Sequence, residues 1–166
     1  VIALGTDSTK VRNKALDAKR QAEDALGGSP VTGWRAFCGS DFFDALISHP
    51  NVEAAYERWS SGEMLRNDPR AAFPFAEIKW EEYRYSVGGQ AYIPSDVAYL
   101  VPEGVPQMFG TWFAPADYMD TVGTVGLPMY SAMEAMDMGK GMDLEVQSNP
   151  ISLCTRPEAV VKLTMS

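Results

Sequence analysis

The first thirty residues show helical periodicity in their hydrophobic positions. The opening residues "VIAL" predict a short strand, and Thr6 to Thr9 then offer several N-caps for a helix. Gly27, Gly28 and Pro30 supply a stop. We therefore predict a helix over residues 8–26, because apolar residues recur there at spacings of three and four. Its predicted face is Val11, Ala15, Ala18, Ala22 and Ala25, which buries little area and suits either a close, flat neighbour or a solvated surface helix.

Two shorter helices are predicted after a strand-like stretch at 31–40. "SDFFDALISHP" has a cap at Ser40 and a stop at Pro50. The next helix begins at Asn51 and carries an i, i+3, i+4, i+7 face of Val52, Ala55, Tyr56 and Trp59. The polar stretch "SSGEMLRNDPRAA" (60–72) is then predicted to be a mobile loop.

From residue 73 onward the hydrophobic period changes to two. Ala76, Ile78 and Trp80 alternate with charged residues, which predicts one strand over 73–80. Further strands are predicted at "QAYIP", "VAYLVP" and "MFGTWFAP", then at two segments around Gly139–Gly141, and finally at "AVVKLTMS". Helices early and strands late indicate an α+β fold.

Composition and charge exclude some functions. The chain has 166 residues and a net charge of −8, which argues against a dedicated nucleic-acid binder. Residues 1–26 hold five basic and four acidic residues, so the rest carries a net charge of −9. No apolar run is long enough for a membrane span. Cys38 and Cys154 lie outside any CxxC pattern, so we expect two reduced thiols, although spacing alone leaves a disulfide open.

The chain offers little material for catalysis. His49 is the only histidine, and its place before Pro50 predicts helix capping or packing. Nucleophile elbows, dinucleotide fingerprints and phosphate loops are absent from the sequence. Asp117 and Asp120 are the one candidate for a catalytic carboxylate pair. Because they follow Pro115 closely, we predict instead that they lie in the first turn of a helix. We therefore expect no enzyme, no catalytic, metal or cofactor-binding residues and no cofactor.

Two groups of apolar residues leave alternatives open. Trp112, Phe113 and Tyr118 are predicted to lie in a core rather than to form a stacking platform. Five methionines between residues 129 and 142 favour plastic packing, although a subunit contact would use the same property: Met129, Met133, Met136, Met138 and Met142.

Several ordered blocks resemble the major capsid protein E family of tailed phages, typified by the lambda head protein. They are "FFDALISHPNVEAAYERW" (42–59), "IKWEEYRY" (78–85), "AYIPSDVAYLVPEGVPQMFGTWFAPADYMDTVGTVGLPMY" (91–130) and "GKGMDLEVQSNPISLCTRPEAVVKL" (139–163). The resemblance covers most of the chain from residue 42 onward.

The resemblance implies the HK97-like capsid fold, with a spine helix in a peripheral domain and an axial domain. It assigns residues 1–30 to the peripheral strand and spine helix, 31–150 to the axial domain and 151–166 to the return into the peripheral sheet. It also marks the chain as a C-terminal fragment without the family's N-terminal arm and extended loop. Within 114–130, prolines and glycines would then set bends between buried anchors at Tyr118, Val122, Val125 and Leu127.

The same resemblance implies a structural major capsid protein of a phage or prophage head that encloses DNA. The expected partners are further copies of the chain, in pentamers and hexamers, with scaffold or protease, portal and decoration proteins and non-specifically packaged DNA. No membrane partner is expected. The location would be the virion head, after assembly in the host cytoplasm.

Three alternatives remain at this stage. The first is an encapsulin-like nanocompartment shell of the same fold. The second, more remote, is a small hydrolase that uses Asp117 and Asp120. The third is a ligand-binding module built on the aromatic strands, which would need a deep cavity.

Overall fold

The computed structural model describes residues 1–59 and 73–165. The chain divides into two compact units. Unit 1 comprises Val1–Pro106 and Arg156–Ser166, and unit 2 comprises Gln107–Thr155. The polar stretch 60–72, predicted to be a mobile loop, lies outside the described residues. These unit boundaries differ from the domain boundaries at 30/31 and 150/151 that the family resemblance implies, and the peripheral and axial assignments stay predictions.

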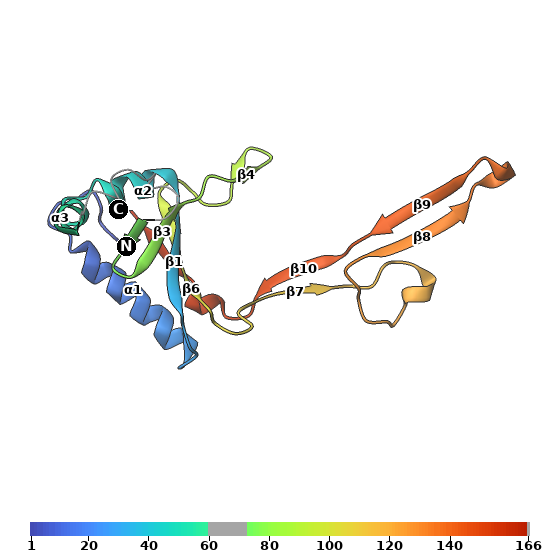
Figure 1. Ribbon diagram of the computed structural model, residues 1–166, viewed down its shortest axis with the longest axis horizontal. Helices are drawn as coiled ribbons and strands as arrows, with labels where there is room; N and C mark the ends of the chain where they lie inside the picture. The colour runs from blue at the N-terminus through green and yellow to red at the C-terminus, as the bar shows by residue number, and fades with distance from the viewer. Residues whose placement is uncertain (60–72, 166) are drawn as a thin grey trace. The chain divides into compact units, whose positions relative to one another are not determined.

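Unit 1 is built on a five-stranded sheet in the order β11-β6-β1-β3-β2 (Figure 1). The strands are β1 (Gly33–Cys38), β2 (Phe73–Phe75), β3 (Ile78–Glu82), β6 (Val97–Glu103) and β11 (Val161–Thr164). Strand β1 runs parallel to β3, whereas the other neighbouring pairs are antiparallel. The α+β prediction is confirmed.

The helices of unit 1 contribute to one core together with one face of the sheet. They are α1 (Val11–Leu26), α2 (Ser40–Ile47) and α3 (Pro50–Trp59). Trp34, Ala36 and Cys38 alternate along β1 and point into this core. Trp80 of β3 is fully buried and stacks on Phe42 of α2 with ring centroids 6.3 Å apart.

The alanine-rich stripe of α1 is the buried face of that helix. Ala15, Ala18 and Ala22 are buried in the core, whereas Ala25 is exposed and Leu26 takes its place. Small side chains let the helix approach the sheet closely. Of the two alternatives left by the sequence, this burial supports a helix that packs on a close, flat neighbour rather than a solvated surface helix. Gly27 ends the helix in the left-handed conformation at φ 59°.

His49 links the loop before α1 to the start of α3. The Asn51 backbone N–H donates to His49 Nδ1 at 3.2 Å, so the proton lies on Nε2, which donates to the Thr6 carbonyl at 3.2 Å. The side chain is buried, and the prediction of capping or packing is confirmed. The predicted cap at Ser40 is wrong, because Gly39 is the N-cap of α2 and its backbone passes close to that of Pro94 and Ser95.

Two strand predictions are also wrong. Residues 1–4 form no strand: Ile2 N–H donates to the Thr164 carbonyl at 2.9 Å, and the chain then turns, with Leu4 N–H bonding to the Ile2 carbonyl. The single strand predicted over 73–80 is a hairpin of β2 and β3. Its two turn residues, Ala76 and Glu77, have φ values of 53° and 61°, which non-glycine residues rarely adopt.

A small hairpin of β4 (Ser86–Val87) and β5 (Gln90–Ala91) extends from unit 1 through the Gly88–Gly89 turn. Unit 2 contains two antiparallel ribbons (Figure 1). One pairs β7 (Phe109–Phe113) with β10 (Pro150–Cys154), and the other pairs β8 (Tyr130–Ala135) with β9 (Met142–Gln147). The predicted strands around Gly139–Gly141 are thus confirmed. Short 3-10 turns lie at η2 (Met119–Thr121), η3 (Asp137–Gly139) and, in unit 1, η4 (Pro157–Ala159).

Candidate assembly surfaces

The two faces of the β8–β9 ribbon differ in polarity. The register places Met133 opposite Leu144 and Glu134 opposite Asp143. Because successive residues of a strand point to opposite faces, one face is uncharged and the other is acidic. The uncharged face, called the apolar face below, consists of Ser131, Met133, Ala135, Met142, Leu144 and Val146. The acidic face carries Glu134, Asp143 and Glu145 beside Tyr130, Ala132 and Gln147.

The apolar face is open to solvent in the isolated chain. Met133 is 70% exposed and Leu144 is 66% exposed, and Met142 and Val146 are exposed as well. A two-stranded ribbon without a covering layer is marginally stable in water. Contiguous exposed apolar residues of this kind mark interaction sites on soluble proteins. The ribbon therefore has the properties of a surface that another element covers.

The acidic face carries directly opposed like charges. Glu134 and Asp143 are cross-strand partners, and this arrangement destabilises a ribbon. Unit 2 as a whole holds six acidic residues and one basic residue, Lys140; the acidic ones are Asp117, Asp120, Glu134, Asp137, Asp143 and Glu145. Repulsion among these carboxylates opposes contact between two acidic faces.

A loop over residues 114–129 is held against the ribbons by three consecutive polar residues, Gln147, Ser148 and Asn149. Asn149 Nδ2 donates to the Pro115 carbonyl at 2.9 Å, and the Asn149 carbonyl accepts from Ala114 N–H at 2.9 Å. Ser148 Oγ donates to the Pro128 carbonyl at 2.7 Å, and Gln147 Oε1 accepts from Asp117 N–H at 3.4 Å. The "QSNP" motif thus fixes both ends of the "APADY…GLP" motif.

Replacing Asn149 with alanine should loosen this loop. The change removes the bond to Pro115 and the one that Asn149 Oδ1 accepts from Gln147, each worth about 1 kcal/mol. We expect faster amide exchange at Ala114 to Asp117 without a change in the core strands of unit 1. Ser152→Ala, which removes one exposed hydroxyl contact with Thr111, is the matched control. Equal exchange rates in both variants would contradict this role for Asn149.

Asp117 and Asp120 lie at a short helical turn, as the helix-start reading predicts. Asp120 is within η2 and Asp117 precedes it, and both are exposed. Inside the turn, Thr121 Oγ1 contacts the carbonyls of Ala116 and Tyr118 at 2.5 and 2.8 Å. Both carboxylates are therefore exposed at a short surface turn rather than buried in a cleft.

The predicted buried anchors of this loop are mostly wrong. Val122, Val125 and Leu127 are exposed, Val125 to 87%, whereas Tyr118 is half-buried. The Tyr118 hydroxyl is shielded from solvent without a hydrogen-bond partner in the described part of the chain. Burial raises the pKa of this hydroxyl, and the charges of Glu145 and Asp117 raise it further. The loop is held by polar bonds and close backbone contact rather than by apolar anchors.

The core prediction also fails for Trp112 and for the methionines. Trp112 is 49% exposed, its ring lying over Gly110, whereas Phe113 is half-buried. All five methionines between residues 129 and 142 are exposed, which supports the subunit-contact alternative over internal packing. The physical reason is that unit 2 has ribbons but no second layer within the unit to bury them.

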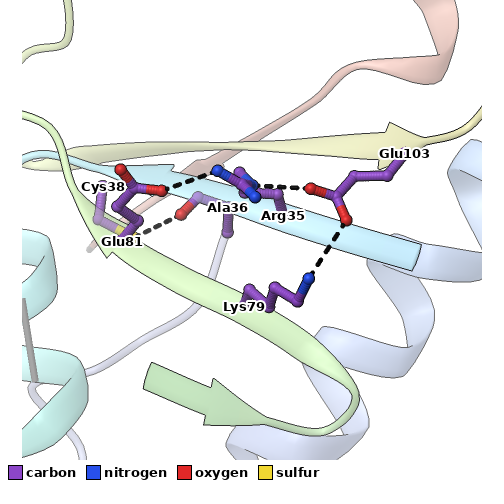
Figure 2. A network of polar contacts seen from close by, with 6 residues as sticks. All are labelled: Arg35, Ala36, Cys38, Lys79, Glu81 and Glu103. Atoms are coloured by element: carbon purple, nitrogen blue, oxygen red, sulfur yellow. Dashed lines mark hydrogen bonds and ion pairs between the residues drawn. The ribbon is translucent and has the colours of Figure 1, made fainter. Parts of the chain in front are cut away.

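Unit 1 presents a second candidate surface, the sheet face opposite the helices. Arg35 Nε donates to Glu103 Oε1 at 2.7 Å, and Arg35 Nη1 donates to Glu81 Oε2 at 3.2 Å (Figure 2). Lys79 Nζ lies 3.7 Å from Glu103 Oε2. These residues come from three adjacent strands, so the network supports the order β6-β1-β3. Because the groups are partly exposed, each pair contributes at most about 1 kcal/mol.

The two cysteines are free, which agrees with the sequence prediction. Cys38 is buried in the core of unit 1 and donates weakly to the Ala36 carbonyl, with sulfur and oxygen 3.7 Å apart (Figure 2). Burial raises the pKa of its thiol far above the ordinary value, while a backbone hydrogen bond from Glu81 opposes the shift. Cys154 is half-buried on β10.

We expect the two thiols to differ in reactivity with maleimide at mildly alkaline pH. The thiolate is the reactive form, and a raised pKa keeps the Cys38 thiol protonated. The folded protein should therefore take up one label, at Cys154, and a second only in denaturant. Peptide mass spectrometry would locate the labels. Labelling of Cys38 in the folded state, at a rate similar to that of Cys154, would contradict the prediction.

Within residues 1–59 and 73–165, no cluster of three or more potential ligands is arranged to hold a metal ion. None of the helices described is long and apolar enough to cross a membrane.

Comparison with known proteins identifies the family. The model of the family described as phage major capsid protein E matches residues 1–165. The chain belongs to this family. It is also 30% identical, over 176 residues, to the major capsid protein of Pseudomonas phage KPP10, and the match covers 96% of the chain and 50% of that relative. The chain thus spans about half the length of the curated relative that it matches.

One solved structure supports the fold. The putative capsid protein of a prophage from E. coli CFT073 superposes with a TM-score of 0.53 at 13% identity, covering 92% of this chain and 47% of that one. A virus-like particle protein from Pyrococcus furiosus gives a TM-score of 0.42 at 11% identity, over 98% of this chain and 53% of its own. The fold predicted from the sequence, the HK97-like capsid fold, is confirmed by the prophage protein and the family match.

Proposed function

We propose that this major capsid protein E family member is a structural subunit of the icosahedral head of a tailed phage or prophage. The observation that carries the proposal is the surface of unit 2. Most of the large hydrophobic residues that the described chain exposes lie in this unit. In a capsid built from many copies of a member of this family, neighbouring subunits would cover these residues. Burial of such residues between subunits is the main favourable term in protein association.

The proposal extends to partners and location. The subunits would form pentamers and hexamers around packaged DNA in the virion head, after assembly in the host cytoplasm. Scaffold or protease, portal and decoration proteins would contact the same shell. The acidic character of the chain fits loose, non-specific enclosure of DNA rather than tight binding, which would require a basic surface. The proposed role is that of a structural shell subunit, without catalytic turnover.

The proposed domain roles follow the family resemblance. Residues 1–30 would supply the peripheral strand region and spine helix, residues 31–150 the axial domain, and residues 151–166 the return to the peripheral part. Strand β11 pairs after unit 2 with β6, a strand within residues 31–150, so the peripheral assignment of residues 151–166 rests on the family resemblance alone. An electron microscopy reconstruction of assembled particles would locate each segment relative to the capsomer centre. A helix α1 that lined the capsomer centre would contradict the spine assignment.

Expression of the complete gene product, followed by negative-stain electron microscopy, tests the function itself. We expect closed shells of uniform diameter. Monomers or irregular aggregates over a range of protein and salt concentrations would contradict the proposal. A variant with Leu144→Asp, which places a charge on the apolar face, is expected to form far fewer shells while its unit 1 stays folded. Lys162→Ala, an exposed position on β11, is the matched control.

A further inference from the structure

We propose that a hairpin of unit 1 inserts its tyrosines into an apolar groove on unit 1 of the next copy of the chain in a capsomer. The tyrosine hairpin comprises residues 85–92, in which β4 pairs with β5 and the Tyr92 N–H donates to the Tyr85 carbonyl at 3.3 Å. The apolar groove is lined by α3, the start of α1 and the β2–β3 hairpin. This inference rests on the proposed shell function and names one contact within each ring of subunits.

The tyrosine hairpin carries its large hydrophobic side chains on one face. Val87 lies opposite Gln90, and Tyr85 and Tyr92 form a cross-strand pair two residues away. Because residues two apart on a strand share a face, these four side chains point to the same side. Tyr85, Val87 and Tyr92 are 72%, 65% and 63% exposed. Among the described residues of unit 1, Val1 is the one other large hydrophobic residue that is exposed, so the exposed hydrophobic surface of this unit is concentrated on the hairpin.

The tyrosine hairpin is uncharged and attached to the sheet. No charged residue occurs from residue 85 to residue 95, in a chain of which 22% is charged, so the hairpin can be covered without burying an ion. The ring of Tyr83 lies 5.1 Å from that of Tyr85 and 5.7 Å from that of Phe37 in β1. These aromatic contacts support a hairpin that is too short to be stable by itself. They also reduce the entropy that the hairpin loses when it binds.

The apolar groove has the size and the lining that aromatic side chains require. Its volume is about 550 Å³, within the range of about 300–1,000 Å³ that is usual for binding pockets. Val52 and Ala55 of α3 line it together with Phe73 and Phe75 of β2. The two phenylalanine rings are nearly parallel, with their centroids 6.3 Å apart. Aromatic rings pair favourably with one another, so this lining favours a tyrosine over an aliphatic side chain.

Two charged residues of the apolar groove suit the hydroxyl group of a tyrosine. Arg12 and Glu77 line the groove, and both are exposed. Arg12 offers N–H donors, and the Glu77 carboxylate has a second oxygen besides Oε2, which accepts from Lys19 Nζ at 3.0 Å. A tyrosine hydroxyl that becomes buried usually finds a hydrogen-bond partner. The groove therefore supplies both an apolar lining for the ring and polar partners for the hydroxyl.

A contact between these two surfaces joins copies of the chain head to tail. Within unit 1, the β4–β5 hairpin extends away from the end that carries α3, so it reaches the groove of a neighbour rather than its own (Figure 1). An interface between two different patches generates a ring when the rotation closes, as pentamers and hexamers require. Two buried tyrosines contribute about 300–500 Å² on the hairpin side, below the 800 Å² or so of a stable pair. The contact therefore adds to others within the capsomer.

Chemical crosslinking of particles of the complete gene product tests the contact. In a Cys154→Ser background, Ala55→Cys places a thiol in the apolar groove and Val87→Cys places one on the tyrosine face of the hairpin, while Cys38 stays buried. The double variant is treated with a short bifunctional maleimide and separated on a denaturing gel. In the matched control, Ser86→Cys replaces Val87→Cys, because Ser86 points to the opposite face of the hairpin.

We expect the double variant to give a ladder of dimers, trimers and larger species up to the size of a capsomer, because each head-to-tail contact joins one further copy. Each single variant should give no crosslinked species. The Ser86→Cys control should give about tenfold less product, because successive residues of a strand point to opposite faces. If the double variant does not assemble, a co-assembled mixture of the two single variants should give crosslinked dimers.

Four outcomes would overturn the proposal. Dimers from one single variant alone would show a symmetric contact. Thiols that stay fully reactive with a monofunctional maleimide in particles would show that the surfaces are uncovered, and protected thiols without a ladder would show another occupant. An Ala55→Cys thiol that is already protected in the unassembled subunit would show that the same chain fills the groove. If the wild-type protein forms no particles, the shell function fails first, and the ladder or its absence in concentrated soluble protein decides this contact separately.

Discussion

Replacing Trp80 with alanine is expected to lower the free energy of unfolding of unit 1 by about 3–5 kcal/mol. The side chain is fully buried, stacks on Phe42, and donates its indole N–H to the Phe75 carbonyl at 3.1 Å. Its removal leaves a cavity between β3 and α2 and deletes the hydrogen bond to the Phe75 carbonyl at the β2–β3 hairpin. Denaturant unfolding monitored by amide exchange in β1 and β3 would measure the loss.

Trp112→Ala is the control for this change. Trp112 is also a strand tryptophan, but its ring is half exposed over Gly110 in unit 2. Its removal should alter the exchange rates in β1 and β3 by little, because cavity terms require burial on all sides. Equal effects of the two substitutions on unit 1 would contradict the core that we describe.

Replacing Gly126 with alanine should displace the loop of unit 2, at a cost of about 1–3 kcal/mol. A Cβ atom at this position would lie 1.8 Å from the Phe113 carbonyl oxygen and 2.4 Å from its carbon. Both are backbone atoms of the strand end, so no side-chain rotation relieves the clash. We expect faster proteolysis between residues 114 and 129, and fewer assembled shells if the loop shapes a subunit contact.

Gly123→Asn provides a matched control in the same loop. Gly123 has φ 76°, a conformation that asparagine tolerates, and no atom lies within 4 Å of a Cβ added there. Its proteolysis pattern should remain close to that of the parent protein. If Gly126→Ala left the loop as resistant as Gly123→Asn does, the close approach of Gly126 to Phe113 would not hold the loop.

Local periodicity predicted the elements of unit 1 well where one face of each element is buried. The alanine stripe of α1 and the alternation in β1 and β6 are patterns that a core imposes directly. The β2–β3 hairpin was missed because its turn contains Ala76 and Glu77 rather than glycine or asparagine. A contact distant in sequence helps to hold that turn: Lys19 Nζ donates to Glu77 Oε2 at 3.0 Å.

The sequence did not predict which apolar residues of unit 2 are covered. Met133, Leu144 and Val146 alternate with acidic residues, as they would in a strand that packs on its own core. Periodicity shows that one face is apolar, but it does not tell whether the same chain or another one covers it. The ordered motifs were more informative, because "APADY", "GLP" and "QSNP" indicated the family and prove to be joined by the bonds of Ser148 and Asn149.

The order of synthesis has a consequence for when a subunit can assemble. Strand β11 pairs with β6 at the edge of the sheet, yet all of unit 2 separates them along the chain. A ribosome that adds about 5–20 residues per second needs about 2–10 s to make residues 107–155. Until then the nascent chain lacks Val161 and Leu163, which lie in the core of unit 1. Unit 1 therefore completes its core only after the ribbons of unit 2 have been made. The order of translation thus delays association between subunits until both candidate surfaces, the apolar face of the β8–β9 ribbon and the charged sheet face of unit 1, are present.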